Sequence, residues 1–127
     1  MAVEIPRILI AGLGGDTGKT VTTLGLVTAL KKRGLTVSVF KKGPDYIDPA
    51  WLGKAAGSRC RNLDTYMVEP TTILARFAAE ASRSDICVIE GNRGIYDGKD
   101  VDGTHSTAEL AKILRAPVVL CLNATKV

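Results

Sequence analysis

Apolar runs alternate along the chain with stretches whose apolar residues recur at helical spacing. Four runs predict buried strands: Arg7–Ala11, Thr36–Phe40, Asp85–Glu90 and Pro117–Leu122. Apolar residues three or four positions apart predict helices over Lys19–Arg33, Pro70–Ser82 and after Ser106. The pair Asp48-Pro49 predicts a further short helix from Asp48 to about Ala56. Strands that alternate with helices in this order indicate an α/β fold, in which helices flank a parallel sheet and ligands bind at the carboxyl ends of the strands.

Two stretches show neither pattern, and a third marks a helix start. Gly57–Asp64 is polar and predicts a loop, and Gly91–Gly103, with four glycines, predicts irregular structure. Asp48 followed by Pro49 has the form of a helix N-cap with proline in the first turn, so we expect the second helix to begin there.

The segment between the first predicted strand and the first predicted helix, GLGGDTGKT, is typical of a phosphate-binding loop. Glycines allow successive backbone N–H groups to face one anion, and the helix N-terminus adds partial positive charge. We expect Lys19 to reach the terminal phosphates of ATP and the Thr20 hydroxyl to bind Mg²⁺. The remaining residues expected to contact the nucleotide are Gly12, Gly14, Gly15, Asp16, Thr17 and Gly18.

The loop is one residue longer than the usual G-x-x-x-x-G-K-[ST] pattern, because Leu13 stands where the first glycine is expected and the glycine is Gly12. A glycine-rich turn without a ligand is the alternative interpretation. A dinucleotide fingerprint fits less well, because its third glycine would be Thr17.

Acidic residues follow the predicted strands at the edge where the phosphate loop lies. Asp45 and Asp48 come after the second strand, Glu90 closes the third, and Asp97 lies in the loop beyond it. Carboxylates at this edge can hold Mg²⁺ for ATP chemistry. Each has a structural alternative: Asp45 and Asp97 form turns well, Asp48 can cap a helix, and Glu90 can be a solvated strand end.

Composition narrows the class of partner. The 127 residues carry a net charge of +4 and are 46% apolar, as expected of a globular core that takes small anionic ligands. Aromatic residues are scarce and the basic cluster Lys31–Arg33 fits a helix C-terminus, so nucleic acid is not indicated. There is no signal peptide and no apolar run long enough for a membrane span, which predicts a cytoplasmic protein with no membrane partner. Cys60, Cys87 and Cys121 lack metal-site spacing and are expected to be reduced.

Several segments together resemble a known family. The phosphate loop is similar to the lengthened loop of dethiobiotin-synthetase-like proteins. The other segments resemble the N-terminal synthetase domain of the cobyrinic acid a,c-diamide synthase family: FKKGPDYIDP from Phe40, RNLDTYM from Arg61, EGNRGIYDG from Glu90 and STAELAKILRAPVVL from Ser106.

This resemblance implies an ATP- and Mg²⁺-dependent ligase of cobalamin biosynthesis. Such an enzyme phosphorylates acetate carboxylates of a corrinoid or related tetrapyrrole, and glutamine-derived ammonia then displaces the phosphate. It implies that Thr20, Asp45 and Glu90 hold the metal, and that Lys42, Asp45, Asp48 and Asp97 serve catalysis. It also implies that residues 1–127 form the N-terminal part of a P-loop amidoligase domain, whose remainder and glutaminase domain lie outside this chain.

Alternatives remain open at this stage. A partner-regulated ATPase of the ParA/MinD type shares the fold, but it carries a lysine early in the loop where this chain has Gly14. The chain alone could be a non-catalytic nucleotide-binding module. The sequence leaves open the oligomeric state, including a homodimer, and the tetrapyrrole: cobyrinic acid, hydrogenobyrinic acid or nickel sirohydrochlorin.

Overall fold

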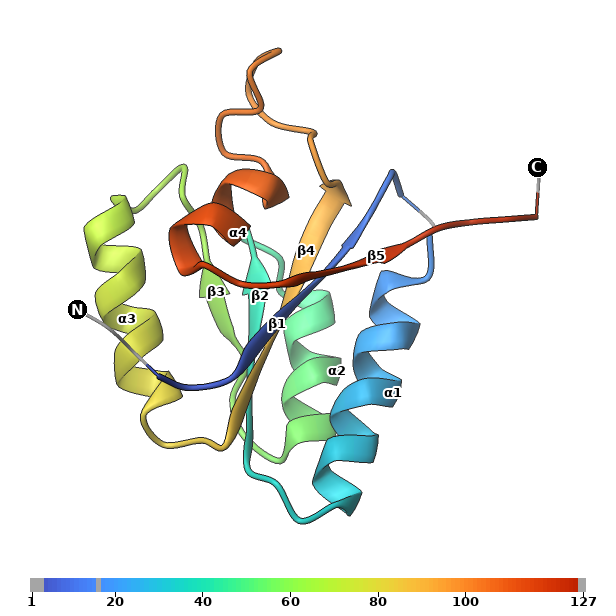
Figure 1. The fold of residues 1–127 in the computed structure, drawn as a ribbon, viewed down its shortest axis with the longest axis vertical. Coiled ribbons are helices and arrows are strands. Elements are labelled where there is room, and N and C mark those ends of the chain that lie inside the picture. The colour runs from blue at the N-terminus through green and yellow to red at the C-terminus, as the bar shows by residue number, and fades with distance from the viewer. Residues whose placement is uncertain (1–3, 16, 126–127) are drawn as a thin grey trace.

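The computed structural model describes residues 4–15 and 17–125, which form a five-stranded sheet between two pairs of helices (Figure 1). The elements, in chain order, are β1 (Arg7–Gly12), α1 (Lys19–Lys32), β2 (Val37–Lys42), α2 (Ile47–Ala56), β3 (Arg61–Leu63), α3 (Pro70–Ala81), β4 (Ile86–Gly94), α4 (Thr107–Leu114) and β5 (Val118–Cys121). No helix within the described ranges is long and apolar enough to cross a bilayer.

The sheet has the order β3-β2-β4-β1-β5, and every neighbouring pair is parallel. The predicted parallel α/β fold is therefore confirmed. The carboxyl ends of all five strands lie at one edge, and the loop after β1 leaves the sheet between its neighbours β4 and β5. The phosphate loop and the strand-end acids consequently share this edge.

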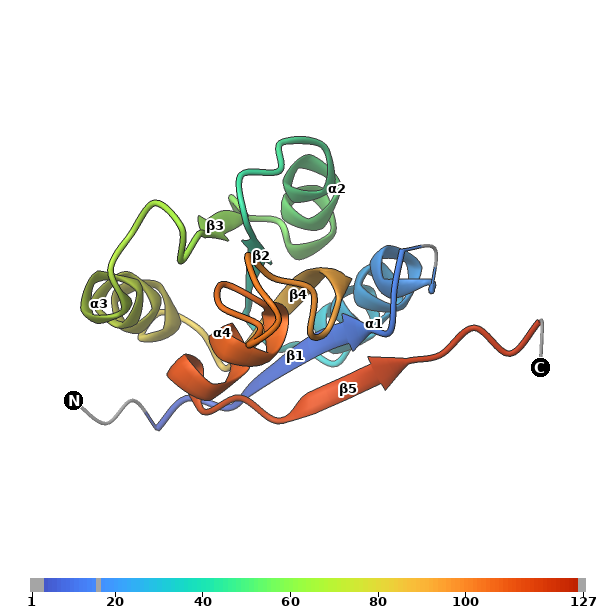
Figure 2. The same cartoon turned by 90° about the horizontal axis from the view of Figure 1, so that it is seen from above.

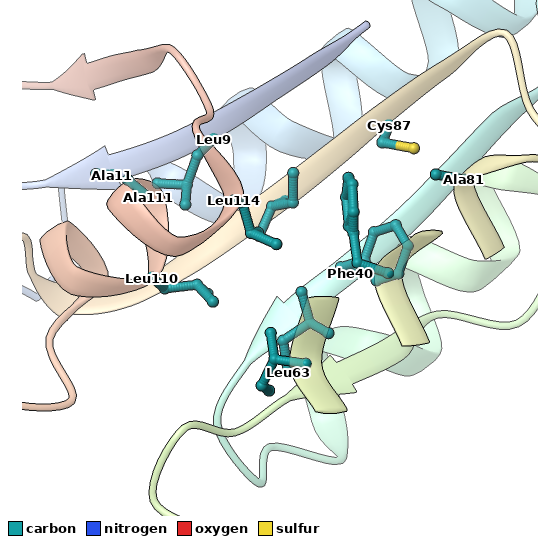
Figure 3. Packing of buried hydrophobic residues seen from close by; sticks show 12 residues of the cluster. Leu9, Ala11, Phe40, Leu63, Ala81, Cys87, Leu110, Ala111 and Leu114 are labelled. Atoms are coloured by element: carbon teal, nitrogen blue, oxygen red, sulfur yellow. The ribbon is translucent and has the colours of Figure 1, made fainter. Parts of the chain in front are cut away.

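Helices α1 and α2 cover one face of the sheet, and α3 and α4 cover the other (Figures 1 and 2). Because side chains alternate along a strand, each inner strand contributes to both cores. In β2, Val37 and Val39 pack toward α1 and α2, whereas Phe40 packs toward α3. Figure 3 shows this second core, where the Phe40 and Phe77 rings lie 5.0 Å apart.

Two segments that were predicted to be irregular contain residues of the sheet. The predicted loop Gly57–Asp64 contains β3, a short edge strand that pairs with β2. It is polar because only Leu63 of its three residues is buried. The predicted irregular stretch Gly91–Gly103 begins with the last residues of β4, which continues to Gly94.

The start of α2 also differs from the prediction. The helix begins at Ile47, and the Asp45 Oδ1 atom accepts hydrogen bonds from the backbone N–H of Ile47 (2.8 Å) and of Asp48 (3.3 Å). Asp45 thus satisfies N–H groups that the first turn leaves unpaired. Asp48 lies inside that turn rather than at the N-cap, so its carboxylate is available for other contacts.

The three cysteines are free thiols, as expected. Burial raises the pKa of Cys60 to about 12 and that of Cys87 to about 11. Both thiols therefore stay protonated at neutral pH and serve packing, because the thiolate is the reactive form.

A pair of helical glycines tests the packing of α2 against the segment that leads into β3. A Cβ atom at Gly53 would lie 2.8 Å from the Ser58 carbonyl oxygen, whereas one at Gly25 in α1 meets nothing within 4 Å. We expect Gly53→Ala to lower the free energy of unfolding by about 1–3 kcal/mol through overpacking. Gly25→Ala should raise it by roughly 0.5–1 kcal/mol through helix propensity.

Denaturant unfolding of both variants beside the parent chain measures the two effects. Equal shifts in the same direction would contradict a close approach at Gly53.

Candidate functional site

The phosphate loop joins β1 to α1 without a side-chain cap on the helix. Gly18, the N-cap residue of α1, has a φ of 86°, and the first turn of the helix carries no acidic residue. The unpaired N–H groups of this turn and the helix dipole therefore favour an anion at the loop. Asp16, which was expected to contact the nucleotide, lies outside the described residues.

The loop folds back closely on itself. Thr17 Oγ1 (3.4 Å) and Lys19 Nζ (3.1 Å) both donate hydrogen bonds to the Gly14 carbonyl oxygen. A Cβ atom at Gly12 would collide with Thr17 Oγ1, so a larger residue there would force the Thr17 side chain or the loop to move. The backbone N–H of Ile95 donates to the Gly12 carbonyl oxygen (2.6 Å), which fixes the end of β4 against the loop.

Three predicted residues meet where the loop enters α1. The Thr20 hydroxyl donates to Glu90 Oε1 (2.6 Å) and lies 3.4 Å from Asp48 Oδ2. Thr20 comes from α1, Asp48 from the first turn of α2 and Glu90 from β4. The structure thus brings together three residues that are distant in the sequence.

Lys41 completes this cluster, and the sequence analysis did not select it. Its ammonium nitrogen lies 3.4 Å from Asp48 Oδ2 and 3.6 Å from Glu90 Oε2, and it donates to the Gly91 carbonyl oxygen (2.8 Å). Only 2% of Lys41 is exposed. The alternation of side chains along β2 could have indicated that Lys41 is buried, because it falls on the same face as the apolar residues Val37 and Val39.

Burial dominates the electrostatics of Glu90. The residue is fully buried, and this burial raises the pKa of its carboxyl, while the hydrogen bond from Thr20 and the charge of Lys41 oppose the rise. Glu90 Oε2 has no hydrogen-bond partner within the described part of the chain. Two carboxylates, Asp48 and Glu90, face the single ammonium of Lys41. Further positive charge would therefore be favourable at this point.

The donors fit Mg²⁺. A hydroxyl and two carboxylates supply hard oxygen atoms, and Mg²⁺ is usually held by one or two carboxylates together with phosphate oxygens and water. Within the described ranges, no group of three or more His, Cys, Asp or Glu side chains gathers as a self-sufficient metal site. This donor set suits a metal that arrives with a triphosphate.

Three other predicted residues lie near the same edge without direct contact to Thr20 or Glu90 in the described part of the chain. Asp45 caps α2. Lys42 projects from the face of β2 opposite to Lys41, and burial lowers the pKa of its ammonium group. Asp97 Oδ2 accepts from the backbone N–H of Gly94 (2.9 Å), which closes the turn after β4.

The strand–glycine loop–helix unit, with an oxygen cluster at the strand ends, defines a nucleotide-binding α/β domain of the P-loop type. The chain belongs to the CobQ/CobB/MinD/ParA nucleotide binding domain family, whose model matches residues 8–119.

The names of curated relatives indicate a narrower class of protein than the family model does. The chain is 48% identical to a cobyrinate a,c-diamide synthase of Magnetococcus marinus over 97% of its length, and 44% identical to one of Salmonella typhimurium over its whole length. It is 47% identical over 95% of its length to a hydrogenobyrinate a,c-diamide synthase of Streptomyces coelicolor. The match covers 26%, 28% and 25% of these proteins, so the chain spans about a quarter of their length. The resemblance to this synthase family is confirmed.

The raised pKa of Glu90 predicts a pH dependence of stability. A raised pKa in the folded state means that folding favours the protonated carboxyl. Its contribution to the free energy of unfolding is present in full below the ordinary value of 4.5 and is lost as the pH rises through the folded value. Glu90→Gln stays neutral and should escape this loss.

Urea unfolding of both proteins from pH 4 to pH 8 provides the measurement. We expect the stability of the parent chain relative to Glu90→Gln to fall as pH rises, whereas Glu4→Gln at an exposed position should track the parent chain. A difference between parent and Glu90→Gln that does not vary with pH would contradict the assignment.

Proposed function

We propose that this domain binds MgATP and belongs to a longer ligase that amidates the a and c acetate carboxylates of cobyrinic acid, or of a related tetrapyrrole, in cobalamin biosynthesis. One observation carries the proposal: the cluster of Thr20, Lys41, Asp48 and Glu90 lies directly beside the phosphate loop. The names of the curated relatives, which are cobyrinate and hydrogenobyrinate a,c-diamide synthases, support the substrate class.

The proposed reaction has two steps. A carboxylate oxygen of the substrate attacks the γ-phosphorus of ATP, which forms an acyl phosphate and releases ADP. Ammonia from glutamine hydrolysis then attacks the acyl carbon, and inorganic phosphate leaves as the carboxamide forms. The first step brings two anions together, so positive charge at the meeting point is the main requirement.

The residues of the site match this requirement. Lys19 and the backbone N–H groups of Gly12–Thr20 hold the phosphates, and Gly14, Gly15, Asp16, Thr17 and Gly18 belong to the same loop. Thr20 and Glu90, with Asp48 beside them, present oxygen donors to Mg²⁺. Bound Mg²⁺ would neutralise charge on the transferred phosphoryl group. Lys41 forms ion pairs with both carboxylates, and its positive charge offsets the repulsion between them.

The substrate side involves residues at the ends of β2 and β4. In the proposal, Lys42 steadies a substrate carboxylate, and the carboxylate of Asp45, whose Oδ1 caps α2, would help to hold Mg²⁺. Asp97 fixes the turn that follows β4 and lies next to the phosphate loop, since a Cβ atom at Gly94 would touch both the Leu13 carbonyl oxygen and Asp97 Oδ2.

The proposal extends to the rest of the enzyme. Residues 1–127 correspond to the N-terminal part of the amidoligase domain of the relatives, and further domains would supply the glutaminase that delivers ammonia. We propose a cytoplasmic enzyme, compatible with a homodimer, with no nucleic-acid or membrane partner.

Gly14 stands where partner-regulated ATPases of the same family carry a lysine, so amidation is the preferred function. A non-catalytic nucleotide-binding module is the alternative for the chain alone.

Two variants, in which one of the aspartates at the start of α2 is replaced by asparagine, test the proposal. Because Asp45 and not Asp48 caps the helix, Asp48→Asn removes a charge from the cluster and leaves the cap in place. In the complete enzyme we expect amidation of cobyrinic acid to fall by about 100-fold or more, a size typical of lost transition-state electrostatics. The variant should remain folded, because Lys41 keeps its ion pair with Glu90 and its hydrogen bond to the Gly91 carbonyl oxygen.

Asp45→Asn is the matched control, because asparagine caps a helix about as well as aspartate. It should keep the fold and reduce amidation less than Asp48→Asn does. Glutamine hydrolysis should persist in both variants. Wild-type amidation by the Asp48→Asn enzyme would defeat the catalytic role of Asp48.

A further inference from the structure

Strand β4 contains a bulge immediately after Glu90. Ile10 of β1 pairs with Glu90, but Gly12 pairs with Gly94, so three residues of β4 stand opposite the single residue Ala11. These residues are Gly91, Asn92 and Arg93. Bulges bend a strand and redirect its side chains, and they recur beside active sites. This bulge lies between Glu90, a member of the cluster with Thr20, Lys41 and Asp48, and the turn closed by Asp97.

Arg93 occupies a backbone conformation that favours glycine. Its φ is 53°, in the left-handed region, and its side chain is exposed. An L-residue with a Cβ atom is strained there by roughly 1–2 kcal/mol, and glycine would avoid this cost. An arginine held in such a conformation at a strand end is therefore a candidate for a role in function rather than in stability.

The bulge lies against the end of β2, next to Lys42. A Cβ atom at Gly43 would lie 3.4 Å from Asn92 Nδ2, which places the bulge against the end of β2. The positive charges of Arg93 and Lys41 add to the effect of burial in lowering the pKa of Lys42, and Asp64 and Glu109 oppose it. Neither Lys42 nor Arg93 makes an ion pair within the described ranges. Two cations thus share a region where no carboxylate pairs directly with either.

The position of this pair relative to the cluster defines what it can bind. Lys41 and Lys42 are consecutive residues of β2, so their side chains leave opposite faces of the same strand end. An anion held by Lys42 and Arg93 would lie on the opposite side of the β2 end from the cluster of Thr20, Lys41, Asp48 and Glu90. A ligand with two carboxylates on a rigid frame could place one at each position.

We propose that Lys42 and Arg93 form an anchoring site for a non-reacting carboxylate of a polycarboxylate substrate, while another carboxylate of the same molecule is activated at the cluster of Thr20, Asp48 and Glu90. The inference rests on the proposed function for the second carboxylate. Guanidinium suits this task because it binds a carboxylate through two parallel hydrogen bonds. Arg93 acts here as a binding and positioning residue, and it takes no part in bond formation.

The test compares Arg93→Gly with Arg115→Gly. Arg115 is also an exposed arginine in the left-handed region (φ 50°), but it precedes β5 at the amino edge of the sheet. Both substitutions remove an arginine and relieve the same strain, so both should leave the melting temperature unchanged or higher. Only Arg93→Gly should weaken substrate binding.

Equilibrium dialysis of cobyrinic acid against the complete enzyme, followed by corrin absorbance, measures binding without turnover. We expect the Kd to rise at least about tenfold in Arg93→Gly, the size of one lost charge-assisted contact. It should stay within about twofold in Arg115→Gly, and Arg93→Lys should recover part of the loss. The KM for ATP should not change in any variant.

The outcomes separate the two proposals. Weakened binding by Arg93→Gly supports the anchor even if the parent enzyme forms no amide, in which case the proposed reaction alone fails. Unchanged binding in Arg93→Gly, equal loss in Arg115→Gly, or no binding of cobyrinic acid by the parent enzyme would overturn the anchor.

Discussion

The functional edge of this domain depends on charged side chains of β2 and β4 that are buried beneath the first pair of helices. Lys41 and Glu90 are register partners on β2 and β4, and both are almost completely shielded from water. A charge in such a place is strongly unfavourable unless it is compensated. Lys41 is compensated by two carboxylates and a carbonyl oxygen, whereas Glu90 keeps one oxygen without a hydrogen bond in the described structure. The cluster is thus organised for a further cation.

Strand order makes this arrangement possible. β4 lies between β2 and β1, so its carboxyl end separates the Lys41 strand from the phosphate loop. Glu90 can therefore contact Thr20 on α1 and Lys41 on β2 at the same time. The bulge of β4 is followed by a backbone hydrogen bond from Ile95 to the Gly12 carbonyl oxygen. This bond holds the loop after β4 against the phosphate loop. The phosphate loop, the proposed metal ligands and the proposed substrate anchor consequently lie at the same edge of the sheet.

Much of this could be predicted from the sequence, because buried parallel strands and a phosphate loop leave strong local signals. The apolar runs placed four of the five strands, and the residues of the loop placed Thr20 beside the strand-end acids. β3 was missed because an edge strand with one buried residue has no apolar run. Lys41 was missed because a charged residue at a buried position is recognised only once the face of its strand is known. The cap was assigned to Asp48 instead of Asp45, since the Asp-Pro signal does not fix the helix start to within a turn.

The central claim is that Thr20, Asp48 and Glu90 surround the metal of a bound metal–nucleotide complex. Its most direct test replaces Mg²⁺ by paramagnetic Mn²⁺ in the presence of ATP and records which backbone amide NMR signals of the chain broaden. The account predicts that the amides of these three residues broaden at the lowest Mn²⁺ concentrations, and that those of Arg33 and Ala81, at the C-terminal ends of α1 and α3, stay sharpest. Broadening centred on another part of the chain, or none with saturating ATP and Mn²⁺, would contradict it.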